Sequence, residues 1–194
     1  MITKKRLNQR TVREGEEITG YKDVELYLLH PPPEFMTETS SYENDNSIVV
    51  KVIYKGKSIL LCGDIEKAGI RNLLRYDEGL LNSTVLKVPH HGSYEEEETD
   101  LFFSRVSPQV AVIPEAERNK FNLPSTYTVI RLKESGAKVY QSGINGAVMV
   151  EIKDAQNDGI LVLTPVIERY VFSKPFQGDD AREDVIFCEF SKLD

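Results

Sequence analysis

Three side chains that could bind a metal follow two apolar segments of the chain. Asp64 comes after the apolar run 59–62 and a glycine, and His90 and His91 come after the apolar run 85–88 and a proline. Both runs are predicted to be buried strands, and ligand sites in open α/β sheets form just beyond the carboxyl ends of strands. Carboxylate and imidazole groups suit Zn, Mn or Fe, and a carboxylate at a tight turn can bridge two ions. These residues therefore predict half of a binuclear metal site.

The same residues also have a purely structural interpretation. An aspartate just before a helix is typical of an N-cap, in which Asp64 would accept a hydrogen bond from a first-turn amide. Two adjacent histidines before Gly92 and Ser93 are also compatible with a surface turn. Two-metal hydrolysis needs ions roughly 3.5 to 4 Å apart, and the chain has 3 histidines, too few for a full set of histidine-rich ligands. Spacing alone favours neither interpretation.

Composition and size are those of an ordinary globular protein. The 194 residues, 40% hydrophobic and 28% charged, suit one domain with a buried core. No stretch approaches the roughly 18 to 20 apolar residues of a membrane-spanning helix, and the start of the chain lacks an apolar signal core. Cys62 and Cys188 lie in apolar runs, which favours reduced core thiols over a disulfide. We therefore expect a cytoplasmic location and no membrane insertion by this chain.

The charge of the chain restricts how it could bind nucleic acid. A formal net charge of -7 argues against broad electrostatic attraction to a phosphate backbone. It does not exclude a nucleic-acid substrate, because bound divalent cations can supply positive charge at the scissile phosphate. The acidic run 95–98 is interpreted as the solvated start of a helix rather than a cation site.

Alternating strands and helices are predicted around the candidate ligands. Apolar periodicity predicts a helix after Asp64, further helices beginning near 93 or 99 and at 125, and strands at 24–29, 48–54, 58–62, 84–88, 109–113, 138–140, 147–152, 160–163 and 185–190. Ser93 with Glu96 fits a capping box, and Ser125 fits an N-cap. His30, before three prolines, is interpreted as a turn residue rather than a ligand. The order of elements indicates an α/β fold in which part of the sheet is parallel.

Several motifs, in order along the chain, resemble the metallo-β-lactamase-fold domain of the competence DNA-uptake protein family ComEC. They are NDNS at 44–47, LCGDIE at 61–66, LKVPHHGS at 86–93, the loop at 119–125, and GAKVY at 136–140 followed by NGA at 145–147. The resemblance covers residues 20 to 152. It is specific because separate motifs fall in register.

The resemblance implies a fold, a cofactor and roles for individual residues. The implied fold is an αβ/βα sandwich with mixed β-sheets, with a divalent metal, Zn or Mn, at one edge. Asp64 matches the bridging aspartate, His90 matches the late histidine ligand, and His91 is expected to be a catalytic proton donor or a further ligand. Residues expected to support the site are Asn46, Gly63, Gly92 and Ser93. The activity proposed for the family is degradation of one DNA strand during uptake.

The chain departs from the family pattern at two places. The His-x-His-x-Asp-His loop that supplies most ligands of the first metal is absent, so the domain is expected to be incomplete in its N-terminal half. Where relatives commonly have His-Pro-Ser, this chain has Leu123, Pro124 and Ser125. We expect residues 1–152 to form a partial metallo-β-lactamase-like domain and residues 153–194 to form a C-terminal β-rich extension that packs on it.

Three functional hypotheses follow. The leading one is a ComEC-like metal-dependent hydrolase of phosphodiesters such as DNA, inactive or weakly active alone, whose site is completed by a second chain or a homodimer. The first alternative is a non-catalytic, degenerate half-domain that acts as an interaction or scaffold module, because a half-sandwich exposes an apolar sheet face. The second alternative is a metallohydrolase of small molecules, which the sequence does not separate from a nuclease.

Overall fold

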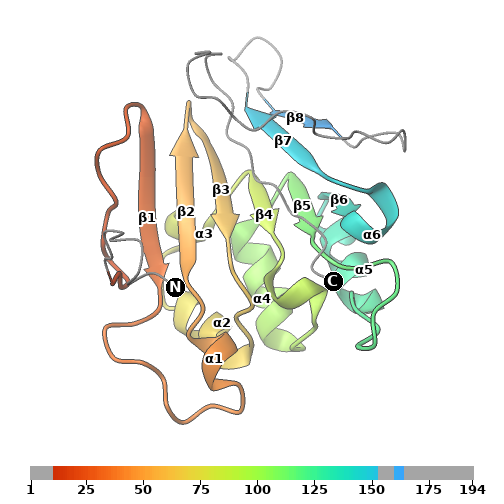
Figure 1. Cartoon of the computed structure of the whole chain (residues 1–194), viewed down its shortest axis with the longest axis horizontal. Helices are drawn as coiled ribbons and strands as arrows, with labels where there is room; N and C mark the ends of the chain where they lie inside the picture. Colours follow the sequence, from red (N-terminus) through yellow and green to blue (C-terminus); the bar gives the residue numbers. More distant parts are fainter. Residues whose placement is uncertain (1–10, 153–159, 164–194) are drawn as a thin grey trace, which may run out of the picture.

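The computed structural model describes residues 11–152 and 160–163. The centre of the fold is a six-stranded sheet. Figure 1 shows the strands side by side in the order in which they occur in the chain. Their bounds are β1 (Val24–His30), β2 (Val49–Tyr54), β3 (Lys57–Leu61), β4 (Val85–Lys87), β5 (Val110–Ile113) and β6 (Lys138–Gln141).

The sheet is mixed, with an antiparallel half and a parallel half. β1, β2 and β3 pair antiparallel, and β3 to β6 pair parallel. Lys55 and Gly56 join β2 to β3, both at positive φ, which is the backbone conformation that a two-residue hairpin turn requires. The predicted hairpin and the predicted α/β class with a mixed sheet are therefore confirmed.

Helices connect the parallel strands and cover one face of the sheet. They are α2 (Lys67–Leu73), α3 (Glu78–Leu81), α4 (Glu97–Val106) and α5 (Thr126–Glu134). Each strand of this half pairs with the next one in sequence, and right-handed crossovers then place every connecting helix on the same face. Apolar side chains from both layers form one core that includes Leu60, Leu86, Phe102 and Leu132. Burying each contributes roughly 1.5 to 3 kcal/mol.

A second, smaller sheet covers the opposite face. β7 (Met149–Ile152) and β8 (Ile160–Leu163) pair antiparallel, as the sequence predicted. Val150 and Ile152 of β7 pack with Ile59, Val85 and Val112 of the large sheet in a separate core. The helices thus pack on one face of the large sheet and β7 packs on the other; Figure 1 shows β7 and β8 near the upper ends of β4, β5 and β6. The predicted domain boundary at 152 falls between the two paired strands.

The helix predicted after Asp64 is present as α2, which ends at Leu73, and α3 is a separate turn. A further local prediction, at the start of α4, is wrong. The predicted capping box is absent, because Ser93 donates its N–H to the His90 carbonyl and the N-cap of α4 is Glu96, without a side-chain cap. The Ser125 cap of α5 is confirmed, with Ser125 Oγ accepting from the Tyr127 N–H at 3.3 Å.

The remaining predictions concern the cysteines, the tail and the membrane. Cys62 is a buried free thiol, and burial raises its pKa to about 12. Cys188 and the predicted strand at 185–190 lie outside the described residues. Among residues 11–152 and 160–163, no helix is long and apolar enough to cross a membrane.

Candidate metal centre

Asp64 and His91 lie close together beyond the ends of two neighbouring strands. β3 and β4 run parallel with Leu61 opposite Lys87, so the segments that follow them leave the same edge of the sheet. The Oδ2 atom of Asp64 lies 3.7 Å from the Nε2 atom of His91. The His90 N–H donates to the Gly63 carbonyl at 3.3 Å, which ties the two segments together through the backbone.

The histidines lie on an unusual stretch of backbone. His90 (φ 41°, ψ 53°) and His91 (φ 50°, ψ 22°) are both left-handed, and Gly92 follows with φ 85°. A left-handed conformation costs a residue with a side chain roughly 1 to 2 kcal/mol, and such strain clusters at functional sites. Glycine is required at position 92, because a Cβ there would lie 2.6 Å from the Cβ of Pro124. The contact with Pro124 therefore explains the glycine, while the supporting role of Gly92 at a metal site stays a prediction.

A backbone carbonyl fixes the ring of His91. Its Nδ1 atom lies 2.5 Å from the Pro114 carbonyl oxygen. A carbonyl only accepts, so Nδ1 carries the hydrogen and Nε2 of the neutral ring keeps a lone pair. Histidine ligands of metals are commonly oriented in this way. The ring thus directs Nε2, whose lone pair could bind a metal, toward Asp64.

Asp64 is held through its own backbone N–H by Ser47 and through its carboxylate by Lys87. The Asp64 N–H donates to Ser47 Oγ at 3.1 Å. Lys87 Nζ lies 3.3 Å from Asp64 Oδ1 and 2.5 Å from the Gly63 carbonyl oxygen. Gly63 has φ 55°, and a Cβ there would lie 2.8 Å from Ser47 Cβ. The N-cap of α2 is Glu66, so the interpretation of Asp64 as an N-cap is wrong.

His90 faces a different carboxylate. Its Nδ1 atom lies 3.1 Å from Glu66 Oε1. Glu66 also accepts from Ser41 Oγ at 2.5 Å and from Asn44 Nδ2 at 2.7 Å. The structure therefore brings His91, rather than His90, next to Asp64. The assignment of His90 as a ligand and of His91 as a proton donor stays a prediction.

Two predicted supporting residues contact other parts of the chain. Asn46 bonds through its side chain to the backbones of Met36 and Tyr42, so it closes the loop before β2. Ser93 uses its backbone, and its carbonyl accepts from Thr128 Oγ1 at 3.0 Å. Three further residues at the site, Ser47, Glu66 and Lys87, had no predicted role. A charged residue at the end of an apolar strand was the available signal for Lys87.

His30 is the final residue of β1 rather than part of a turn. It is fully buried, and its Nδ1 atom lies 2.8 Å from the Ser47 carbonyl oxygen. Burial is the main influence on its pKa and lowers it; the Ser47 carbonyl and the charges of Glu14 and Asp45 oppose this, while Arg75 adds to it. His30 is thus a core histidine close to the site segment.

The donor atoms fit a metal in kind but not in number. A carboxylate and an imidazole with a free Nε2 are suitable ligands for Zn or Mn. Within the described part of the chain, however, no three His, Cys, Asp or Glu side chains come together as a metal-binding group. The residues present therefore match one portion of a metal centre.

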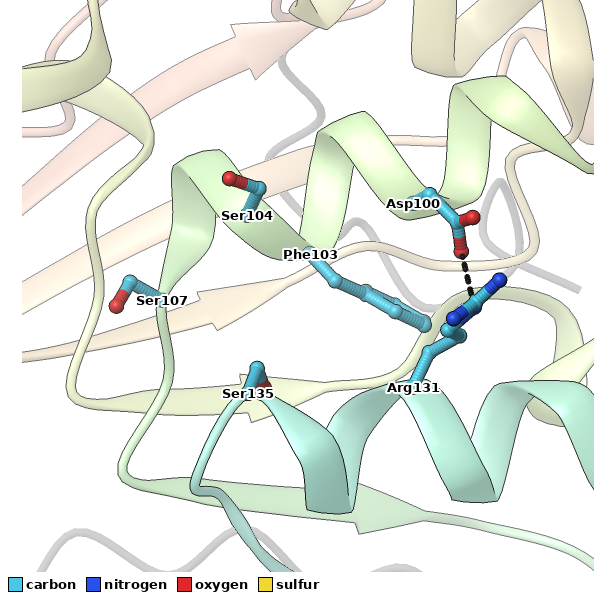
Figure 2. Close-up of a pocket in the computed structure, with 6 residues that line it drawn as sticks. All are labelled: Asp100, Phe103, Ser104, Ser107, Arg131 and Ser135. Carbon is cyan, nitrogen blue, oxygen red and sulfur yellow. Dashed lines mark ion pairs between the residues drawn. The ribbon is translucent and has the colours of Figure 1, made fainter.

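A separate cavity lies between α4 and α5. It has a volume of about 400 Å³, and Figure 2 shows the side chains around it: Asp100, Phe103, Ser104, Ser107, Arg131 and Ser135. Arg131 is paired with Asp100 at 3.3 Å and with Glu134 at 3.1 Å. Its charge is balanced, and the cavity includes none of the predicted site residues.

The mixed α/β sheet, with a carboxylate and an imidazole beyond adjacent strand ends, has the fold class that the resemblance implied. Sequence comparison supports that resemblance. The chain is 30% identical over 106 residues to competence protein ComA of Neisseria gonorrhoeae and 25% identical over 143 residues to ComE operon protein 3 of Bacillus subtilis. These matches cover 55% and 74% of the chain but only 15% and 18% of the relatives. The chain therefore resembles a small part of these longer competence proteins.

Further comparisons give a weaker likeness. Recombination protein 2 of Haemophilus influenzae is 31% identical over 108 residues, covering 56% of the chain and 13% of that protein. A solved structure from Parabacteroides distasonis, described as a metal-dependent hydrolase, has a TM-score of 0.49 at 14% identity and covers 73% of this chain and 60% of that chain. No protein-family model matches the chain.

Proposed function

We propose that the chain carries part of a metal-dependent hydrolase site for phosphodiesters, with DNA as the substrate. The observation that carries this proposal is the 3.7 Å approach of His91 Nε2 to Asp64 Oδ2 beyond adjacent parallel strands. The names of the two competence proteins among the relatives support a nucleic-acid substrate.

In this proposal Asp64 and His91 hold a divalent metal, Zn or Mn. Such a metal supplies Lewis-acid polarisation of a phosphoryl oxygen and a hydroxide nucleophile at neutral pH. The chain's own residues provide orientation: the Pro114 carbonyl fixes the His91 ring, and Ser47 fixes the turn at Asp64. With a net charge of -7, the metal is also the source of positive charge for a phosphate.

The missing donors come from outside the described cluster. A second copy of this chain or another polypeptide would complete the site, because metal hydrolase centres use three protein ligands or more. Activity is therefore expected to depend on the concentration of the chain or on an added partner.

Metal binding tests the proposal directly. The full chain is loaded with Zn or Mn, and bound metal is measured by elemental analysis together with the oligomeric state. Asp64→Asn and His91→Asn are expected to lose metal. Asparagine suits position 91 because it tolerates positive φ. Asp100→Asn changes a carboxylate of the α4–α5 cavity and serves as the matched control.

Hydrolysis is measured next, on a phosphodiester dye ester and on an end-labelled DNA strand. Metal-dependent cleavage that Asp64→Asn and His91→Asn abolish would support the proposal. A wild-type chain that binds no metal in any oligomeric state, or variants that retain all of it, would contradict it and favour a non-catalytic interaction module.

A further inference from the structure

We propose that Glu66 is a positioning residue that fixes the ring of His90 with Nδ1–H toward the carboxylate, so that Nε2 is the donor atom offered to the site. The consequence for metal binding rests on the function proposed above. The orientation of the ring does not, and it can be measured on the metal-free chain.

Glu66 is itself tightly held. Ser41 Oγ approaches its Oε2 atom and Asn44 Nδ2 approaches its Oε1 atom, from the segment that leads into and forms α1 (Tyr42–Asp45). Its backbone is the N-cap of α2, and its side chain is only 17% exposed. Both carboxylate oxygens thus face hydrogen-bond donors, which fixes the orientation of the carboxylate. A carboxylate held in this way is a suitable orienting partner for an imidazole.

His90 has one nitrogen that needs this partner. Its Nδ1 atom is buried and has no in-line hydrogen bond to any described residue, while Glu66 Oε1 lies 3.1 Å away. A carboxylate only accepts, so the contact is favourable when Nδ1 carries the hydrogen. The neutral ring then has its lone pair on Nε2. The proposed orientation turns this Nδ1–H toward Glu66 Oε1.

The two neighbouring histidines are therefore oriented by the same principle with different acceptors. His91 Nδ1 faces the neutral carbonyl of Pro114, and His90 Nδ1 faces the charged carboxylate of Glu66. In each ring, Nε2 is then the nitrogen whose lone pair could bind a metal.

Another carboxylate in the neighbourhood supplies a control. The charges of Glu66 and His90 both influence the pKa of Glu95, which is raised chiefly by burial. The Glu95 backbone N–H donates to Thr99 Oγ1 at 2.8 Å, whereas the carboxylate paired with the His90 ring among the described residues is that of Glu66. If negative charge alone decided the ring form, removing either carboxylate would have the same effect.

The ring form is read by long-range proton–nitrogen NMR on chain labelled with ¹⁵N-histidine. The chain has 3 histidines, and single substitutions assign their signals. At pH 8.5, above the ordinary histidine pKa of about 6.5, His90 is expected as the Nδ1–H form. Glu66→Ala should shift it toward the Nε2–H form, and Glu66→Gln should restore Nδ1–H, because the amide oxygen also accepts. Glu95→Gln should leave it unchanged.

Zn²⁺ affinity of the same variants forms the second arm. Glu66→Ala is expected to weaken binding about 10- to 100-fold, with Glu66→Gln intermediate and Glu95→Gln close to wild type. Thermal unfolding confirms that each variant is folded. If Glu66→Ala does not fold, Glu66→Met replaces it, because methionine keeps most of the side-chain volume but offers no oxygen acceptor.

The NMR and Zn²⁺-binding experiments distinguish failure of the positioning role from failure of the proposed function. A wild-type His90 in the Nε2–H form, or a ring unaffected in both Glu66 variants, overturns the positioning role. A wild-type chain that binds no Zn²⁺ but whose ring responds to Glu66 retains the positioning role and overturns the proposed function. Unchanged affinity in Glu66→Ala, with wild-type binding intact, shows that Glu66 does not serve the site.

Discussion

Two lysines on opposite faces of the large sheet have contrasting surroundings. Lys51 of β2 is 5% exposed, and its ammonium donates to the carbonyls of Gly79, Leu80 and Asn82 around α3. Lys87 of β4 has a side chain that is 13% exposed and contacts one carbonyl and the carboxylate of Asp64. Backbone carbonyls alone therefore accept the hydrogen bonds of Lys51, whereas Lys87 forms an ion pair with Asp64, a candidate metal ligand.

The difference shows how a buried cation can be assigned a role. Burial lowers the pKa of Lys51, and three carbonyl oxygens compensate for the lost hydration of its charge. Lys87 balances a carboxylate that a divalent metal would also bind. We therefore expect Lys51 to control stability and Lys87 to control affinity for metal.

The largest effect is expected from Lys51→Met. Methionine fills a similar volume but leaves the carbonyls of Gly79, Leu80 and Asn82 without this charged donor, and each loss costs about 1 kcal/mol. The free energy of unfolding should fall by about 3 kcal/mol, measured by urea denaturation. Zn²⁺ affinity should be unchanged. A loss below about 1 kcal/mol would show that water replaces the ammonium and that the two lysines are not distinct in stability.

Glycine substitutions extend the comparison to the backbone around the site. Gly92→Ala is expected to lower the free energy of unfolding by about 3 kcal/mol, because φ 85° and a contact at 2.6 Å with Pro124 both oppose a Cβ. Gly136→Ala is the matched control, with φ 90° and open space around it, and should cost about 1 kcal/mol. Equal losses would mean that Pro124 moves aside freely.

Lys87→Met should affect metal binding more than folding. Its ion pair with Asp64, whose side chain is 40% exposed, is partly screened by water, so the loss of stability should be about 1 kcal/mol. Removing a positive charge 3.3 Å from Asp64 should tighten Zn²⁺ binding about tenfold. Weaker Zn²⁺ binding would instead identify Lys87 as the group that shapes the turn at Asp64.

The smallest effect is a pH dependence from His30, a buried base in β1. Since burial lowers its pKa, the unfolded chain binds a proton more readily than the folded chain. Stability is therefore highest above the unfolded pKa of about 6.5 and declines as the pH falls from there toward the folded pKa. The expected loss is about 1 kcal/mol between pH 7.5 and 5.5 by urea denaturation, and His30→Gln should flatten this dependence.

The sequence was informative where periodicity and strand order decide the structure. The apolar runs of β3 and β4, with a helical connection between them, were enough to place Asp64 and the two histidines at one edge of a parallel sheet. The sequence could not show which histidine faces Asp64. That depends on the left-handed backbone at His90 and His91, which turns the side chains in directions that a regular strand or helix would not give.

Other features depend on contacts between segments far apart in the chain. Glu66 meets Ser41 and Asn44 across more than twenty residues, and no local pattern indicates such a contact. Lys51 follows two valines in an apolar strand, and alternation alone gives no indication that α3 would supply acceptors for it. The partners of Glu66 and Lys51 are therefore set by tertiary hydrogen bonds, which strand and helix propensities do not predict.

The register between β3 and β4 also has a consequence for errors in folding. Leu86 points toward the helix layer and Val85 toward the small sheet, so Lys87 lies on the same face as Val85. If β4 paired one residue out of step, these side chains would exchange faces, and the lysine would enter the helix-facing core. The misaligned chain would pay for a buried charge and lose its contact with Asp64 together. A misassembled sheet thus becomes unstable at the same point where it would lose the site, which removes the defective form from the folded population.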